Sequence, residues 1–159
     1  METVSSFSDV TLDLQQISDR IEIDELLARY ARALDYRRFD ELDGIFTADA
    51  TFDAGGLGAP TGPAAIRQMI EGTIGHLDAT QHLVGKSLME FAEDGDSAEV
   101  TTYLISQHIR ESTDGPVKHY FLGGEYADRV VRTPQGWRIA YRRLDRMWKQ
   151  GDRAVIAPA

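Results

Sequence analysis

The amino-acid sequence predicts an α+β fold: a cone in which a strongly curved, barrel-like antiparallel sheet encloses three N-terminal helices. One observation is a change of hydrophobic period, since apolar residues recur at helical spacing up to His76 and alternate with a period of two after it. A second is the punctuation of the alternating part by turn-forming segments at 93–96, 114–116 and 133–136. A sheet curved around helices leaves an open mouth, where we expect a ligand pocket.

The first predicted helix follows a polar segment without periodicity, residues 1–15, which we expect to be a flexible leader. Ser18 is the predicted N-cap, and the helical body begins at Ile21. The apolar residues of this helix fall largely on one stripe that can pack against a core: Ile17, Ile21, Ile23, Leu27, Tyr30, Ala31 and Leu34.

Two shorter helices and a brief strand complete the first half of the chain. The second helix is predicted at 39–46, with Asp40 as its cap. A strand at 50–54 ends in a glycine-rich segment. The third helix opens with Pro63, whose fixed φ suits the first helical position. Its apolar side consists of Ile66, Met69, Ile70 and Ile74.

Four long strands are predicted in the second half, at 80–91, 98–111, 117–132 and 137–149. The Gly123-Gly124 pair lies inside the third of them and predicts a bulge or bend. We expect a single domain at residues 16–150, followed by a small, apolar tail at 151–159.

Composition excludes several classes of function. The chain has 159 residues, the size of one domain, with 26 acidic and 17 basic side chains and a net charge of −9. A domain this acidic lacks the basic surface that nucleic acids require. It has no cysteine, which excludes disulfide scaffolds, thiol nucleophiles and thiolate metal sites. It shows neither a signal peptide nor an apolar run that could span a membrane, so we expect a soluble, cytoplasmic protein that binds neither membrane nor nucleic acid.

Asp35 ends the first predicted helix at an unusual place for a carboxylate. The C-terminal end of a helix carries the negative pole of its dipole, which repels anions. Asp35 lies about 80° from Leu27 around the helix, at the edge of the apolar stripe. It is therefore a candidate functional group; the alternative is an ion pair with the neighbouring Arg37 or Arg38.

Two histidines are candidates for chemistry with Asp35. His82 opens the first long strand, and His108 lies in the second. A carboxylate that hydrogen-bonds an imidazole holds its tautomer and raises its basicity, so Asp35 with His82 would be a general base able to remove a carbon-bound proton. Packing of both histidines in the core is one alternative. A non-haem iron site made by Asp35, His82 and His108 is another.

The remaining polar candidates are Tyr30, Tyr103, Tyr126 and Arg142. A phenol can donate to a developing oxyanion, and an arginine can stabilise a leaving anion. The alternative is that these are residues at the edge of the core, with Arg142 on a solvated strand face or at a subunit interface. The sequence has no GxGxxG, P-loop, GxSxG or HExxH motif, so nucleotide hydrolysis, Rossmann redox chemistry and serine hydrolysis are not supported.

Three segments in this order resemble the SnoaL-like members of the nuclear transport factor 2-like superfamily, over about residues 15–150. They are the helix exit ALDYRRFD at 33–40, the strand TQHLVG at 80–85, and the hairpin with GGEY at 123–126 and GWR at 136–138. Within that group the chain is similar to scytalone dehydratase, bile acid 7α-dehydratase and hexachlorocyclohexane dehydrochlorinase.

The resemblance implies that Asp35 and His82 form a catalytic dyad. The histidine would abstract a proton and a leaving group would depart, without a metal or an organic cofactor. By the same resemblance Tyr30, His108 and Arg142 occupy the places of assisting residues. The chain departs from scytalone dehydratase near Ala54 and Tyr126, where that enzyme has a tyrosine and an asparagine, so scytalone itself is not the expected substrate.

The expected function is therefore a cofactor-independent lyase of the dehydratase type, acting on a small cyclic or polyketide-like molecule. Its expected catalytic residues are Asp35 and His82, and its substrate-binding residues are Tyr30, Tyr103, His108, Tyr126 and Arg142. One alternative is a polyketide cyclase or isomerase with the same dyad. Another is a non-catalytic module that binds a small molecule or a partner. By resemblance we also expect a homo-oligomer, a trimer or dimer.

Overall fold

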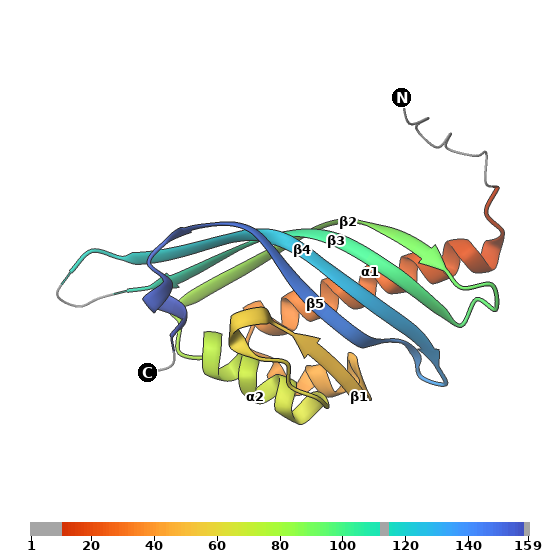
Figure 1. Ribbon diagram of the computed structural model, residues 1–159, viewed down its shortest axis with the longest axis horizontal. Helices are drawn as coiled ribbons and strands as arrows, with labels where there is room; N and C mark the ends of the chain where they lie inside the picture. The colour runs from red at the N-terminus through yellow and green to blue at the C-terminus, as the bar shows by residue number, and fades with distance from the viewer. Residues whose placement is uncertain (1–10, 112–114, 158–159) are drawn as a thin grey trace.

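The structure of the protein, a computed structural model, describes residues 11–111 and 115–157 and confirms the predicted α+β class (Figure 1). Five strands form one curved sheet that does not close. The helices lie against its concave side, and the hydrophobic core lies between these two layers (Figure 1). Within the described ranges, no helix is both long enough and apolar enough to cross a membrane.

Helix α1 (Leu14–Asp35) begins earlier than predicted. Asp13 is its N-cap: the Asp13 carboxylate accepts the Gln16 backbone N–H at 2.7 Å, and the Gln16 side chain accepts the Asp13 N–H at 3.0 Å. This capping box stabilises a start that precedes the apolar stripe. The prediction of Ser18 as the cap is wrong, because Ser18 lies inside the helix and its hydroxyl donates to Glu22. The predicted leader therefore extends too far, and its residues 1–10 lie outside the described residues.

The C-terminal end of α1 is a Schellman motif, which makes Asp35 the last residue of the helix. The Arg37 N–H donates to the Leu34 carbonyl and the Arg38 N–H donates to the Ala33 carbonyl. Arg37 takes the left-handed conformation that the motif requires, with a φ of 56°. Glycine is the usual residue at that position, so the turn after Asp35 is held at some conformational cost.

Three short elements connect α1 to the second α-helix. The predicted second helix is a 3₁₀-helix, η1 (Phe39–Gly44), and its N-cap is Arg38 rather than Asp40. Strand β1 (Phe46–Asp53) is longer than predicted and is followed by η2 (Gly55–Leu57). Helix α2 (Pro63–Ile74) begins at the predicted proline and buries Ile66, Ile70 and Ile74.

Four long strands make up the antiparallel part of the sheet: β2 (Ala79–Phe91), β3 (Ser97–Arg110), β4 (Lys118–Thr133) and β5 (Gly136–Gly151). The four predicted strands are confirmed with small shifts at their ends. β1 pairs in parallel with β5, which gives the order β1-β5-β4-β3-β2 and leaves β2 as an edge strand. The predicted turn at 114–116 begins outside the described residues.

The predicted bulge at Gly123-Gly124 is confirmed, since the pairing of β4 with β5 shifts between these two residues. A Cβ on Gly124 would stand 2.4 Å from the Asp145 carbonyl oxygen, and a Cβ on Gly123 would stand 2.1 Å from the Trp148 ring. Only glycine permits such close approach, so this bend in the sheet depends on the pair.

The C-terminal segment is part of the fold, which corrects the prediction of a tail at 151–159. A 3₁₀-helix, η3 (Arg153–Ile156), is capped by the Asp152 side chain, and Val155 is buried in the core. His76 Nε2 lies 3.0 Å from the Val155 carbonyl oxygen and ties this segment to the end of α2. Residues 158–159 lie outside the described residues.

Candidate active site

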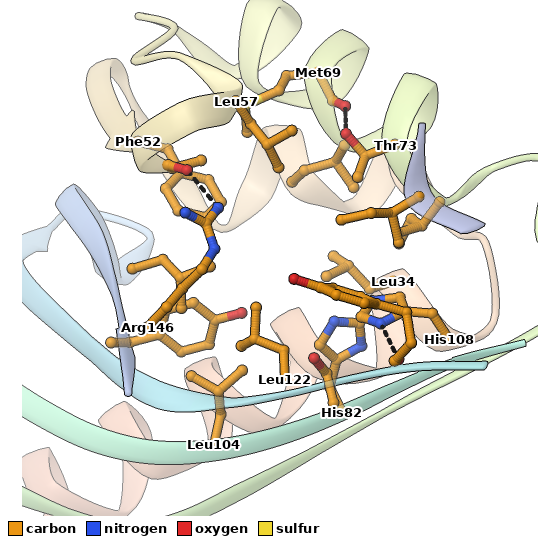
Figure 2. A pocket seen from close by; sticks show the side chains of 18 of the residues that line it. Leu34, Phe52, Leu57, Met69, Thr73, His82, Leu104, His108, Leu122 and Arg146 are labelled. Carbon is orange, nitrogen blue, oxygen red and sulfur yellow. Dashed lines mark hydrogen bonds between the residues drawn. The ribbon is translucent and has the colours of Figure 1, made fainter. Parts of the chain in front are cut away.

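A cavity lies between α1, α2 and the concave face of the sheet (Figure 2). Its volume is about 80 Å³. Most of its wall is apolar and includes Leu34, Phe52, Leu57, Ile70, Leu104 and Leu122. The polar residues on its wall include Tyr30, His82, Ser106, His108, Tyr126 and Arg146. A mostly apolar cavity with a few convergent polar groups is the usual form of a small-molecule site.

Asp35 and His82 are in direct contact at one side of the cavity. Asp35 Oδ1 lies 2.7 Å from His82 Nδ1, and Asp35 Oδ2 accepts the His82 backbone N–H at 2.8 Å. One carboxylate thereby joins the end of α1 to the edge strand β2. The His82 side chain is 7% exposed and the Asp35 side chain 18%, so both groups are largely shielded from bulk water.

This contact determines which nitrogen of His82 is free. A carboxylate only accepts hydrogen bonds, so we assign the proton of neutral His82 to Nδ1, which leaves Nε2 as an acceptor. His82 lines both the cavity and a separate depression behind it, whereas Asp35 lines the depression and not the cavity. The imidazole therefore stands between the carboxylate and the cavity, which is the arrangement of a general base and the group that orients it.

His108 lies beside His82, with ring centroids 5.6 Å apart and ring planes at 86°. Its Nδ1 is 3.2 Å from the Tyr120 carbonyl oxygen, which only accepts, so Nδ1 carries the proton and Nε2 is an acceptor. Burial, together with the neighbouring His82, lowers the pKa of His108 to about 4. At neutral pH His108 is therefore uncharged.

The other predicted substrate-binding residues are only partly brought together. Tyr30 and Tyr126 both line the cavity, edge to face, with ring centroids 5.8 Å apart. Arg142 does not line it: it is fully buried, and its Nε and Nη2 donate to the Asp128 carboxylate at 2.7 and 2.6 Å. Tyr103 is 63% exposed. The structure thus places Arg142 and Tyr103 outside the cavity, and it also overturns the alternative of a solvated Arg142.

Arg146 is a cavity residue that the sequence reasoning missed. It comes from β5, and its Nη2 donates to the Ala54 carbonyl at 2.6 Å (Figure 2). The sequence did hold a signal for it. With Arg142 facing inward, the strand period of two places Leu144 and Arg146 on the same face, and both line the cavity.

Two further cavity residues were missed for different reasons. Ser106 lies opposite His82 in the pairing of β2 with β3, so strand register alone could have found it. Ile156 comes from η3, and no local pattern in the sequence shows that this segment folds back over the cavity.

The structure does not support the alternatives for Asp35. Within the described residues, Arg37 donates to the Leu77 carbonyl and Arg38 pairs with Glu41 at 3.5 Å, so neither pairs with Asp35. In residues 11–111 and 115–157, no three His, Cys, Asp or Glu side chains are grouped as ligands for a metal ion. That geometry runs against the iron-site alternative.

The family follows from comparison with known proteins. The model of the SnoaL-like domain matches residues 15–143. Uncharacterized protein Rv2910c of Mycobacterium tuberculosis (strain H37Rv) is 37% identical over 132 residues, which are 82% of this chain and 87% of that protein. The chain belongs to the SnoaL-like domain family. The resemblance expected from the sequence is thus confirmed.

Solved structures share this SnoaL-like, nuclear transport factor 2-like fold. A scytalone dehydratase-like protein from Novosphingobium aromaticivorans has a TM-score of 0.76 and 23% identity, over 86% of this chain and 89% of that chain. Hexachlorocyclohexane dehydrochlorinase LinA-type3 from Novosphingobium barchaimii has a TM-score of 0.76 and 16% identity, over 89% of this chain and 94% of that chain. At these identities the likeness shows the fold.

The part matched to the SnoaL-like domain contains Asp35, His82 and His108 but ends before Arg146 and Ile156. The cavity is thus completed by residues that lie beyond the matched range.

Proposed function

We propose that the protein is a cofactor-independent lyase that eliminates water, or another small leaving group, from a small cyclic or polyketide-like molecule. The observation that carries the proposal is the 2.7 Å contact between Asp35 and a histidine that lines an apolar cavity. A carboxylate-held imidazole is suited to removing a proton from a carbon next to a carbonyl group. The dehydratase-like and dehydrochlorinase neighbours of the same fold support this class of reaction.

The proposed reaction begins when His82 Nε2 takes the proton from the carbon next to the substrate carbonyl. The electrons of the broken C–H bond pass to the carbonyl oxygen and form an enolate. Asp35 remains ionised and stabilises the imidazolium. When the enolate collapses, a C=C bond forms and the bond to the leaving oxygen breaks. His82 returns its proton to that oxygen, so water is the second product and the base is regenerated.

The other polar groups of the cavity divide into acceptors and donors. His108 Nε2 accepts only, so it suits a substrate hydroxyl. The phenols of Tyr30 and Tyr126 are donors that can stabilise the enolate oxygen. Arg146 lies across the cavity from His82 in Figure 2 and provides a positive charge for a carbonyl or anionic group. This polarity favours a substrate with an apolar body and oxygen at both ends.

The test is a turnover assay of wild-type protein and the His82→Ala variant on a panel of hydroxylated and halogenated cyclic ketones. We expect His82→Ala to lose at least about a thousandfold in rate. His119→Ala is the matched control, because His119 is exposed and does not line the cavity. Full activity of His82→Ala would overturn the role of His82 as base. No turnover of any panel member by the wild type would favour a non-catalytic binding module.

A polyketide cyclase or isomerase is the second candidate, because the same base would form the same enolate. Product mass separates the two. Elimination divides the substrate into two products, whereas isomerisation and internal aldol cyclisation conserve its mass. A product of unchanged mass, still dependent on His82, would replace the lyase assignment and keep the base.

A further inference from the structure

We propose that Arg142 is a positioning residue that strengthens Tyr30 and Tyr126 as hydrogen-bond donors to an oxyanion held in the cavity. Arg142 does not line the cavity, and its effect passes through the two phenols that do. The inference rests on the proposed function, because the enolate of that reaction is the oxyanion concerned.

The geometry places a full positive charge against both rings. The Arg142 guanidinium carbon lies 4.1 Å from the centre of the Tyr30 ring and 3.9 Å from the centre of the Tyr126 ring. Arg142 is 0% exposed, and both tyrosines are buried. Its Nε and Nη2 donate to Asp128, while Nη1 has no hydrogen-bond partner among the described residues. The cation therefore lies over both phenol rings, in the corner that these two nearly perpendicular rings form, and one of its donor nitrogens is unused.

Core packing alone does not account for this cluster. Removing an ion pair from water carries a large desolvation cost, and apolar residues of similar volume often stabilise a core at least as well. A buried cation does something that apolar residues cannot do: in a low-dielectric site it lowers the free energy of a nearby negative charge. The negative charge that the proposed reaction creates would form on the cavity side of Tyr30 and Tyr126.

The two members of the ion pair act on the phenols in opposite directions. Burial raises the pKa of Tyr30 and of Tyr126, and the neighbouring Tyr30 raises that of Tyr126 further. The positive charge of Arg142 opposes the rise in both phenols, and the negative charge of Asp128 adds to it. A phenol whose ionised form is stabilised is a stronger hydrogen-bond donor. Loss of Arg142 and loss of the Asp128 charge should therefore have opposite effects on the same two groups.

The test follows the ionisation of the two phenols by NMR of protein isotope-labelled at tyrosine Cζ, with Tyr30→Phe and Tyr126→Phe to assign the signals. In Arg142→Met we expect the ionisation constant of each phenol to fall by about tenfold or more, and in Asp128→Asn to rise by about the same factor. A purely structural pair would be loosened by either change and would shift the phenols in one common direction. That result, or no shift, would overturn the proposal.

Asp128→Asn keeps the shape of the side chain and one acceptor for Arg142, so it decides the question even where Arg142→Met does not fold. Arg142→Lys keeps the charge, and we expect its phenols to titrate within about threefold of wild type. A fall or no change in Asp128→Asn contradicts the inference.

A ligand measurement connects the phenols to oxyanion binding. The wild type should bind para-nitrophenolate more tightly than the neutral para-nitrotoluene. Arg142→Met should weaken the phenolate alone, by about tenfold. A wild type without preference for the phenolate would overturn the oxyanion role. Failure of the proposed function is a separate result: the phenols and the phenolate would respond as expected, and no substrate would turn over.

Discussion

Helix α1 carries two shielded carboxylates that are held in different ways, Asp19 in its second turn and Asp35 at its end. Asp19 accepts from Arg132 at 2.9 and 2.8 Å, from Trp137 Nε1 at 3.1 Å and from Gln15 at 3.0 Å. The donors of Asp35 are the backbone and ring N–H groups of one residue, His82. Asp19 accepts hydrogen bonds from three different side chains, whereas Asp35 accepts from one residue, whose ring is titratable.

The partners determine what each carboxylate can do. Arg132 keeps its proton throughout the physiological range, and its hydrogen bonds hold the pKa of Asp19 below its usual value. That pair can fix α1 against β4 but cannot move a proton. An imidazole, unlike a guanidinium, can both accept and release a proton, and the ring of His82 lines the cavity. Burial and hydrogen bonding alone therefore do not distinguish a structural from a functional carboxylate; a titratable partner facing a cavity does.

The largest expected effect is on turnover, in Asp35→Asn. The asparagine oxygen can still accept the His82 backbone N–H, while its amide donates to Nδ1 and moves the imidazole proton to Nε2. The base is then blocked, and we expect a loss of about a thousandfold in rate with a small change in stability. Nitrogen NMR of His82 reads the tautomer directly and needs no substrate. Unchanged proton placement in the variant would contradict the role assigned to Asp35.

The same substitution at the other carboxylate, Asp19→Asn, should act on stability instead. It places an amide donor among the donors of Arg132 and Trp137 and leaves the guanidinium without its counter-ion. We expect the free energy of unfolding to fall by about 3 kcal/mol, measured by urea denaturation. Turnover per folded molecule should match the wild type. A large loss of rate in the folded variant would remove the distinction between the two carboxylates.

A smaller effect is expected from the pH dependence of stability at His108. Its pKa is lowered to about 4, below the unfolded value, so the unfolded chain takes up this proton first as the pH falls. The contribution of neutral His108 to the free energy of unfolding is complete above about pH 6.5 and decreases as the pH falls toward 4. At pH 4.5 about 2.5 kcal/mol of it is lost. His108→Asn should lose stability less steeply over that window. The free energy of unfolding is measured by urea denaturation at each pH. An equally steep fall with pH in the variant and the wild type would contradict a buried, neutral His108.

The smallest expected effect concerns the turn that ends α1. Arg37→Gly and Arg37→Ala both lose the hydrogen bond to the Leu77 carbonyl, but only glycine adopts the positive φ freely. We expect the glycine variant to be the more stable of the two by about 1 kcal/mol. Thermal unfolding of the pair measures this. Equal stability of the two variants would contradict a conformational cost at residue 37.

Much of the fold could be predicted because its signals are local. Pro63 marked the start of α2, and Gly123-Gly124 marked the bulge in β4. The predicted start of α1 is too late because the apolar stripe begins only at Ile17, whereas the capping box lies ahead of it at Asp13. The burial of the C-terminal segment is not predicted for a related reason. The segment is too short to show the hydrophobic period that indicates a buried face.

The class of the fold, the order of its elements and the positions of Asp35 and His82 at a helix end and a strand start all follow from the sequence. The hydrogen bond between these two residues depends on the folded chain, as does the placing of Arg142 behind the cavity and of Arg146 on its wall. The physical reason is the range of the interactions. Period, caps and turns are set by neighbours along the chain, whereas the distance between α1 and β2 and the depth of a side chain in the cone depend on how the whole sheet curves.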